Sequence, residues 1–286
     1  MAEASRKSGI ALISPAIVLL IVGFVLPALI MLVLSFRFYS GLGGIGDAWT
    51  LGNYVSIVTD SYYLEIIGRT LLLGLVVTLI CLSAGMPLAL FIVRASPKVQ
   101  TATLLLVVFP LLLNVVVRSY GWIILLAPRG LINEAIVALG AGTWPLALMY
   151  NMTGSVIGLT QIYLPFMVLL LVPALQNIPA DVEAAAYTLY ASKARVFFAI
   201  VVPLALPGII AGSILVFVLT IGALVTPRML GGPRFRVLAT QIYDEFIQNL
   251  NWPAGAALAF LLTVLTLVLI WGANRLAARW TRGFAS

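Results

Sequence analysis

The sequence predicts an all-α membrane protein with six transmembrane helices, arranged as a single domain over residues 1–286. Composition is the first reason. Hydrophobic residues make up 63% of the chain and charged residues only 9%, whereas charged residues make up roughly a quarter of a soluble domain. The second reason is that apolar residues gather in six runs, each near or above the about 20 residues with which a helix crosses a bilayer.

The first three expected spans lie in the first half of the chain. Residues 10–34 follow a short polar leader and form a run too long for the core of a signal peptide, so we expect a retained span. Residues 37–69 form a long loop whose Trp49 suits a membrane interface. The second span is expected over residues 70–93. The third, over residues 104–126, is interrupted by a proline and two polar residues.

The other three expected spans flank two larger loops. The fourth covers residues 149–175 and follows a glycine-rich connection. A polar stretch, residues 177–203, separates it from the fifth span, residues 207–225. A second large loop leads to the sixth span, residues 254–273, and a basic segment closes the chain.

Basic residues predict that both termini are cytoplasmic. Six spans put the two termini on one side, and cytoplasmic loops carry an excess of Lys and Arg, above all when they are short. With the termini inside, the inner segments hold nine of the sixteen basic residues, namely Arg6, Lys7, Arg94, Lys98, Lys193, Arg195, Arg275, Arg279 and Arg282. The same orientation puts residues 177–203 in the cytoplasm.

Residues 177–203 predict a short helix between two spans. Pro179 suits the first helical position, where its missing N–H costs nothing. Asp181 and Glu183 then fall in the positive first turn, and basic residues fall near the negative end. Alanines between them favour helix and leave a smooth surface. We therefore expect a helix from Asp181 to Ala194 that another protein can approach closely, with an ordinary amphipathic connector as the alternative.

Family motifs run through the same stretch. Ala191-Ser192, Phe197, Pro203-Leu204 and Pro207-Gly208-Ile209 follow the spacing of the cytoplasmic loop in permease subunits of ABC importers, and the stretch resembles that loop. In this register, Ala184 stands where the family has Glu, and Tyr190 where it has Gly. The resemblance implies a coupling helix that contacts an ATPase subunit. The residues implied in coupling are Asp181, Glu183, Ala184, Ala185, Ala186, Tyr190, Ala191 and Ser192.

Other motifs narrow the resemblance. Val117-Arg118-Ser119-Tyr120-Gly121-Trp122 and Gly130-Leu-Ile-Asn133 resemble signatures of spermidine/putrescine-type permeases. The resemblance covers nearly the whole chain and implies a type I ABC-importer permease in a bacterial inner membrane. It implies as partners a second permease subunit, two cytoplasmic ATPase subunits and an external substrate-binding protein. The implied cargo is a polyamine, with opine, phosphonate, iron and sulfate importers as alternatives.

Missing motifs separate this interpretation from its rivals. No Gly-x-x-x-x-Gly-Lys-Ser/Thr motif occurs, so we expect ATP and Mg²⁺ on a partner ATPase and no cofactor on this chain. There is no His, and Cys81 is alone, which argues against an enzyme and against a cysteine metal site. A secondary transporter would keep a carboxylate at mid-membrane, and the sequence shows none. The net charge of +7 is scattered over short loops, so nucleic acid is not expected.

Arg118 is the charged residue that lies well within an apolar run. A charge at that depth is costly and usually faces protein or water, which indicates a pathway or gate residue. The alternative is a side chain that snorkels to headgroups or pairs with Glu134. Asn114 lies four residues earlier and is expected on the same helical face. The expected substrate path comprises Asn114, Arg118, Tyr120, Trp122, Gln161, Tyr163, Thr220, Thr226 and Asp244.

Overall fold

The computed structural model describes residues 14–15, 17–41, 44–140 and 146–282, with side chains as far as residue 275. Two compact units emerge within these stretches: one joins residues up to 64 with residues 241–264, and the other joins residues 65–240 with those from 265 onward. The polar leader and the first residues of the first expected span, residues 10–13 and 16, lie outside the described residues.

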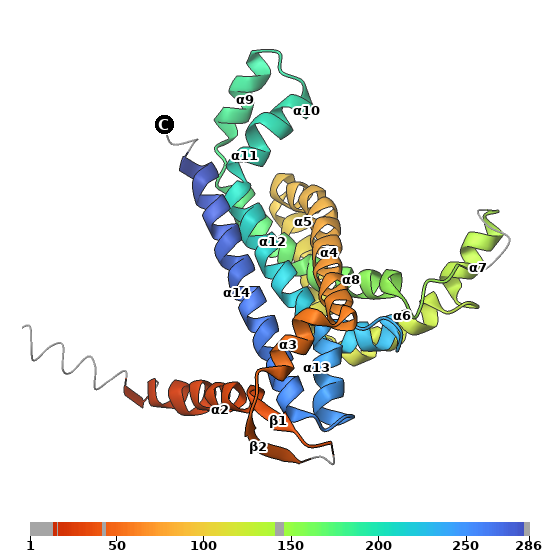
Figure 1. Ribbon diagram of the computed structural model, residues 1–286. Helices are drawn as coiled ribbons and strands as arrows, with labels where there is room; N and C mark the ends of the chain where they lie inside the picture. The colour runs from red at the N-terminus through yellow and green to blue at the C-terminus, as the bar shows by residue number, and fades with distance from the viewer. Residues whose placement is uncertain (1–13, 16, 42–43, 141–145, 283–286) are drawn as a thin grey trace, which may run out of the picture. The chain divides into compact units, whose positions relative to one another are not determined.

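A short β-hairpin between helices characterises the first unit (Figure 1). Its elements are η1 (Ile21–Val25), α2 (Leu26–Ser35), β1 (Arg37–Tyr39), β2 (Ile45–Trp49), α3 (Gly52–Thr59), the start of α4 (Ser61–Arg94), most of α13 (Leu238–Ile247) and the first part of α14 (Trp252–Arg282). The strands are antiparallel, with Arg37 opposite Trp49. The Arg37 guanidinium lies 4.5 Å from the centre of the Trp49 ring, a cation–π contact that fixes the hairpin.

Polar side chains tie the hairpin and the helices of this unit together. Ser35, the last residue of α2, shares a hydrogen bond of 2.7 Å with the Tyr54 hydroxyl of α3. The buried carboxylate of Glu245 accepts hydrogen bonds from Gln241 Nε2 at 2.8 Å and from Asn249 Nδ2 at 3.1 Å. These donors compensate a buried charge that would otherwise be expensive, and they fix the turn from α13 to α14.

The second unit holds most of the helices. Its elements, beside the remaining parts of α4, α13 and α14, are α5 (Pro97–Val108), η2 (Phe109–Leu112), α6 (Val115–Leu126), α7 (Leu131–Ala138), α8 (Met152–Gln176), α9 (Ala180–Thr188), α10 (Lys193–Val196), η3 (Phe197–Val201), α11 (Val202–Leu204), α12 (Leu206–Ile221) and η4 (Pro227–Gly231). Buried side chains of α4, α8 and α12 form its core, with Val77, Leu171 and Val216 fully buried.

Glycine allows α8 and α12 to pack closely. A β-carbon at Gly208 would clash with Ala174 Cβ, and one at Gly212 would lie 2.7 Å from Met167 Sδ. Apolar burial drives helices together only weakly in lipid, so close backbone approach at small residues carries much of the association. The packing of α8 on α12 therefore depends above all on the absence of a side chain at Gly208, because the flexible Met167 side chain can move away from residue 212.

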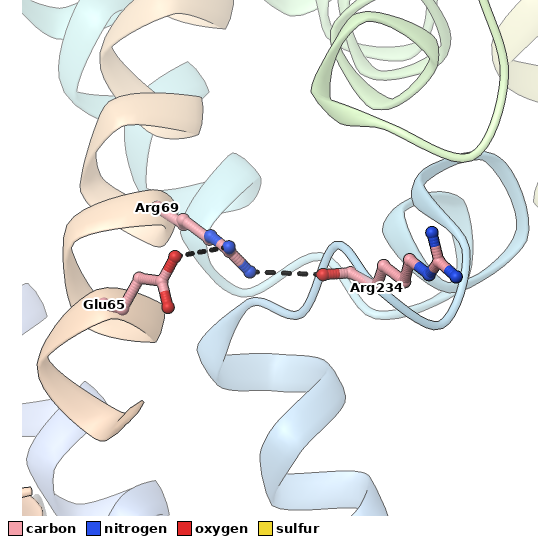
Figure 2. A network of polar contacts seen from close by, with 3 residues as sticks. All are labelled: Glu65, Arg69 and Arg234. Atoms are coloured by element: carbon pink, nitrogen blue, oxygen red, sulfur yellow. Dashed lines mark hydrogen bonds and ion pairs between the residues drawn. The ribbon is translucent and has the colours of Figure 1, made fainter. Parts of the chain in front are cut away.

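A polar network joins α4 to the loop after η4. Arg69 forms an ion pair with Glu65 one turn earlier on α4. Its Nη1 also donates to the Arg234 carbonyl oxygen at 3.2 Å, as Figure 2 shows. Next along α4, Thr70 Oγ1 accepts a hydrogen bond of 2.8 Å from the Leu238 amide. The guanidinium and the hydroxyl thus anchor the loop that leads into α13.

Five helices among the described residues are long and apolar enough to cross a membrane, and a bent helix pair makes a sixth when counted as one span. The five are 17–35, 61–94, 115–138, 152–176 and 252–275, and the bent pair joins Lys193–Leu204 to Leu206–Ile221 at 69°. The expected all-α class with up to six spans and a helix in the 177–203 loop is confirmed.

Two expected spans have a different form in the structure. The run over residues 104–126 is divided between η2 and α6, because Asn114 begins a new helix by accepting the Val116 amide at 2.8 Å. The long apolar helix of this region is Val115–Ala138 instead. The expected fifth span begins within a helix pair bent at Ala205, between Pro203 and Pro207. Proline removes a helical hydrogen bond and clashes with the preceding turn, which explains the bend.

Candidate functional site

The loop after α8 carries two short helices rather than one. The expected helix from Asp181 to Ala194 ends at Thr188, and Lys193 begins α10. The reason is a left-handed residue, Tyr190, with φ of 56°. The Ala191 amide donates to the Ala186 carbonyl at 3.1 Å, which closes the last turn of α9. The basic residues expected at the negative end of α9 therefore lie on α10, and only the acidic first turn matches the helix dipole.

Some of the residues implied in coupling are exposed on this loop, and others are packed against the core. Ser192 is exposed and caps α10, with its Oγ accepting the Arg195 amide at 3.3 Å. Two of the residues implied in coupling, Ala185 and Ala186, differ in their surroundings. Ala185 is exposed, whereas Ala186 packs against the core. Ala191 packs there as well. The residues of the loop that are exposed to an approaching protein include Asp181, Ala184, Ala185, Leu189, Tyr190 and Ser192.

Glu183 makes a contact that the sequence does not reveal. Its Oε2 lies 2.9 Å from Nη2 of Arg94, the last residue of α4. Arg94 is 89 residues away along the chain, so no local pattern indicates the pairing. The ion pair joins α9 to the longest helix in the described part of the chain.

Polar atoms without a hydrogen-bond partner lie on α6 and on α8, two helices that contact each other. Nε and Nη1 of Arg118 are buried and have no hydrogen-bond partner, and the same holds for Thr160 Oγ1 and Gln161 Oε1 on α8. Tyr163 of α8 lies close to Arg118, and its hydroxyl donates to the Leu219 carbonyl at 3.0 Å. Buried polar groups are nearly always paired, by water or another chain where the protein itself supplies nothing.

Arg118 has no carboxylate partner among the described residues, so the expected alternative of pairing with Glu134 is not realised there. Two nitrogens of Arg118 and two side-chain oxygens of α8 are thus without a hydrogen-bond partner in the described part of the chain. Thr160 is not among the expected path residues. The signal was its position beside Gln161 in an apolar run.

The other expected path residues have separate surroundings. Asn114 is the N-cap of α6 and is exposed, unlike the buried nitrogens of Arg118. Tyr120 is exposed and Trp122 half-buried. Thr220 is buried and satisfied by the Val216 carbonyl at 2.7 Å. The two remaining residues are Thr226, buried beside Gly158, and Asp244, buried in the other unit.

The described residues contain no group of three or more His, Cys, Asp or Glu side chains that could hold a metal ion. The loop of α9 and α10 exposes small and apolar side chains, and α6 and α8 carry buried polar atoms without a hydrogen-bond partner.

Known proteins resemble the chain over most of its length. The model of the family described as "Binding-protein-dependent transport system inner membrane component" matches residues 82–282. The spermidine/putrescine transport system permease protein PotB of Escherichia coli K12 is 34% identical over 254 residues, with 88% of this chain and 92% of PotB covered. PotB of Haemophilus influenzae is 32% identical, with 89% and 90% covered.

The fold is also found in a solved structure. A bacterial ABC transporter that imports the acidic polysaccharide alginate contains a chain that matches with a TM-score of 0.74. The match covers 97% of this chain and 98% of that chain, at 18% sequence identity. At this identity the match concerns the fold alone.

Proposed function

The chain belongs to the family of binding-protein-dependent transport system inner membrane components, and we propose that it forms half of the pathway of an importer for polyamines such as spermidine and putrescine. It is a multi-pass permease subunit of an ABC importer. The observation that carries the polyamine assignment is the 34% identity to a spermidine/putrescine permease over 88% of the chain.

The remaining parts of the importer are proposed as separate chains. A second, paralogous permease subunit completes the pathway, two cytoplasmic ATPase subunits bind ATP and Mg²⁺, and an external binding protein delivers the cargo. This chain binds no cofactor and catalyses no reaction. The sequence supports this division, because it lacks a phosphate-binding loop of the Gly-x-x-x-x-Gly-Lys-Ser/Thr type. Both termini and the loop with α9 and α10 face the cytoplasm, in agreement with the basic short loop at Arg94.

Energy enters through α9 in this proposal. A short helix laid in a groove of another protein is a common recognition mode, and the exposed Ala185 leaves room for close approach. When the ATPase subunits close on ATP, they move α9, and the ion pair from Glu183 to Arg94 moves the end of α4 with it. The helices around the pathway then change between outward and inward openings.

Replacing Ala185 by arginine tests the docking step. Ala185 is exposed, so the larger side chain interferes with the ATPase but not with the fold. We expect normal membrane insertion, loss of co-purifying ATPase and loss of uptake. The matched control is Lys193→Arg, which introduces the same side chain at another exposed site of the loop without changing the charge there. Full retention of the ATPase by Ala185→Arg would contradict docking through this face.

A second candidate cargo is favoured by one observation. The unpaired guanidinium nitrogens of Arg118 suit an anion better than a polycation, since like charges repel. An importer of sulfate, phosphonate or an opine carboxylate would use such a group directly. Calorimetric titration of the proposed external binding protein with spermidine, putrescine, sulfate and a phosphonate decides between the two cargoes. Under the polyamine proposal we expect binding of the two amines. Binding of an anion alone would favour the second candidate.

A further inference from the structure

Tyr190 occupies a backbone conformation that an amino acid with a β-carbon rarely adopts. Its φ is 56°, and its amide donates to the Tyr187 carbonyl at 3.0 Å as the last turn of α9 closes. Glycine is the usual residue in this left-handed position, because it has no β-carbon to clash with the backbone. A tyrosine here therefore costs the loop stability in the isolated chain.

The Tyr190 ring makes no packing contact within the described part of the chain that would offset the cost of this backbone conformation. Tyr190 is 98% exposed and its neighbour Leu189 is 82% exposed. Tyr150 provides the comparison, with a similar φ of 58°. The Tyr150 amide donates to the Leu230 carbonyl at 2.7 Å, and its side chain packs beside Gly232. Tyr150 is thus held by its own chain, whereas Tyr190 extends away from the described residues.

We propose that the Tyr190 ring, together with Leu189, is an anchor that inserts into an apolar pocket of the ATPase subunit docked on α9. The proposal rests on the proposed function, because it needs an ATPase partner at this loop. The ATPase is the occupant that we commit to, because the two side chains continue the exposed face of Ala184 and Ala185 at the end of the same helix.

The left-handed turn explains how the anchor is presented. It ends α9 and sets the backbone at residue 190 before the partner arrives, so binding has to restrict only the rotamer of the ring. Tyrosine is one of the residues that carry most binding energy at interfaces, since it joins a large apolar ring to a hydroxyl that hydrogen-bonds. Strain in the backbone is retained where a functional contact offsets it.

Substitutions at residue 190 separate the ring from the backbone. Tyr190→Gly removes the ring and relieves the strained conformation, and Tyr190→Phe keeps the ring. The complete importer is purified through a tag on this chain, and the ATPase subunits are then removed from it. Titrating purified ATPase back into the remaining permease complex gives the affinity of the ATPase for that complex. We expect Tyr190→Gly to weaken ATPase binding about tenfold while the permease folds as well as wild type. Tyr190→Phe should bind within about twofold of wild type.

The matched control is Tyr150→Gly, which removes the same side chain from the same backbone conformation away from the loop. We expect it to leave ATPase affinity unchanged. Unchanged affinity in Tyr190→Gly would overturn the anchor while leaving ATPase docking intact. If the wild-type complex binds no ATPase, the proposed function itself fails, so the two failures are distinguishable.

A benzophenone amino acid in place of Tyr190 identifies the occupant directly. Irradiation of the assembled importer should cross-link residue 190 to the ATPase subunit. A cross-link to lipid, to the second permease subunit or to a second copy of this chain would overturn the proposal.

Discussion

The guanidinium of Arg94 and the carboxylate of Glu183 lie 2.9 Å apart, so the last residue of α4 is joined to the first turn of α9. Arg94 remains 55% exposed and Glu183 25% exposed. Ion pairs so open to water contribute only about 0.2–1 kcal/mol to stability, because solvent screens the charges. The pair therefore matters more for the position of α9 than for the free energy of unfolding.

Neutralising either partner should uncouple ATP hydrolysis from uptake without unfolding the protein. In Arg94→Gln or Glu183→Gln we expect normal amounts of assembled importer and a lower ratio of cargo transported to ATP hydrolysed in proteoliposomes. The control is Lys98→Gln, an exposed lysine close to Arg94 in sequence. A charge swap of Arg94 and Glu183 should restore only part of the ratio, because it puts a cation in the positive first turn of α9. Wild-type ratios in both single variants would exclude this role.

Replacement by alanine should destabilise the protein more at Gly208 than at Gly212, both on α12. In Gly208→Ala the new β-carbon clashes with Ala174 Cβ and lies 2.9 Å from the Leu170 carbonyl oxygen, and neither atom can turn aside. Overpacking of this kind costs about 1–3 kcal/mol. In Gly212→Ala the nearest atom is Met167 Sδ, at the flexible end of a side chain. Thermal unfolding in detergent should therefore occur at a clearly lower temperature for Gly208→Ala than for Gly212→Ala. Equal midpoints would contradict the close packing of α8 and α12.

Composition and local pattern were enough to predict the helical membrane class, up to six spans and a helix in the 177–203 loop. These features depend on runs of apolar residues and on alanine, proline and acidic residues close together in sequence. The division of the third expected span followed from the local capping by Asn114, which the helical-face argument overlooked. The ion pair of Arg94 with Glu183 could not be predicted, because it depends on how helices far apart in sequence pack. The assignment of path residues stays a prediction, and Asp244 belongs to a different unit from Arg118.

Cysteine labelling should establish the orientation of the chain. Native Cys81 is buried, and Cys81→Ala provides a background without reactive thiols. In that background, Ser192→Cys should react with an impermeant maleimide only in inside-out vesicles, because Ser192 is exposed on the proposed cytoplasmic loop. Thr59→Cys, exposed at the end of α3, should react only from outside. Labelling of Ser192→Cys in intact cells would show that this loop is outside and would contradict the proposed orientation.

Arg118 should be required for uptake but not for assembly. Its buried Nε and Nη1 have no partner in the described part of the chain, so their removal leaves no buried carboxylate unpaired within it. In Arg118→Met, which keeps length and apolar bulk without charge, we expect wild-type amounts of importer and wild-type basal ATPase activity. Uptake should fall by about tenfold, equivalent to about 1.4 kcal/mol in the barrier to transport. Val117→Met, at the exposed neighbouring position, is the control.

The same variant also tests the structural alternative for Arg118. If the guanidinium instead pairs with the second permease subunit, Arg118→Met leaves that subunit's partner group buried and unpaired, which is costly. The assembled importer would then become scarce, and uptake per assembled complex would stay at the wild-type value. Quantifying the complex by co-purification of both permease subunits, alongside uptake in the same vesicles, separates the two outcomes. Wild-type uptake with wild-type assembly would contradict both roles, and the unpaired nitrogens would then be satisfied by water alone.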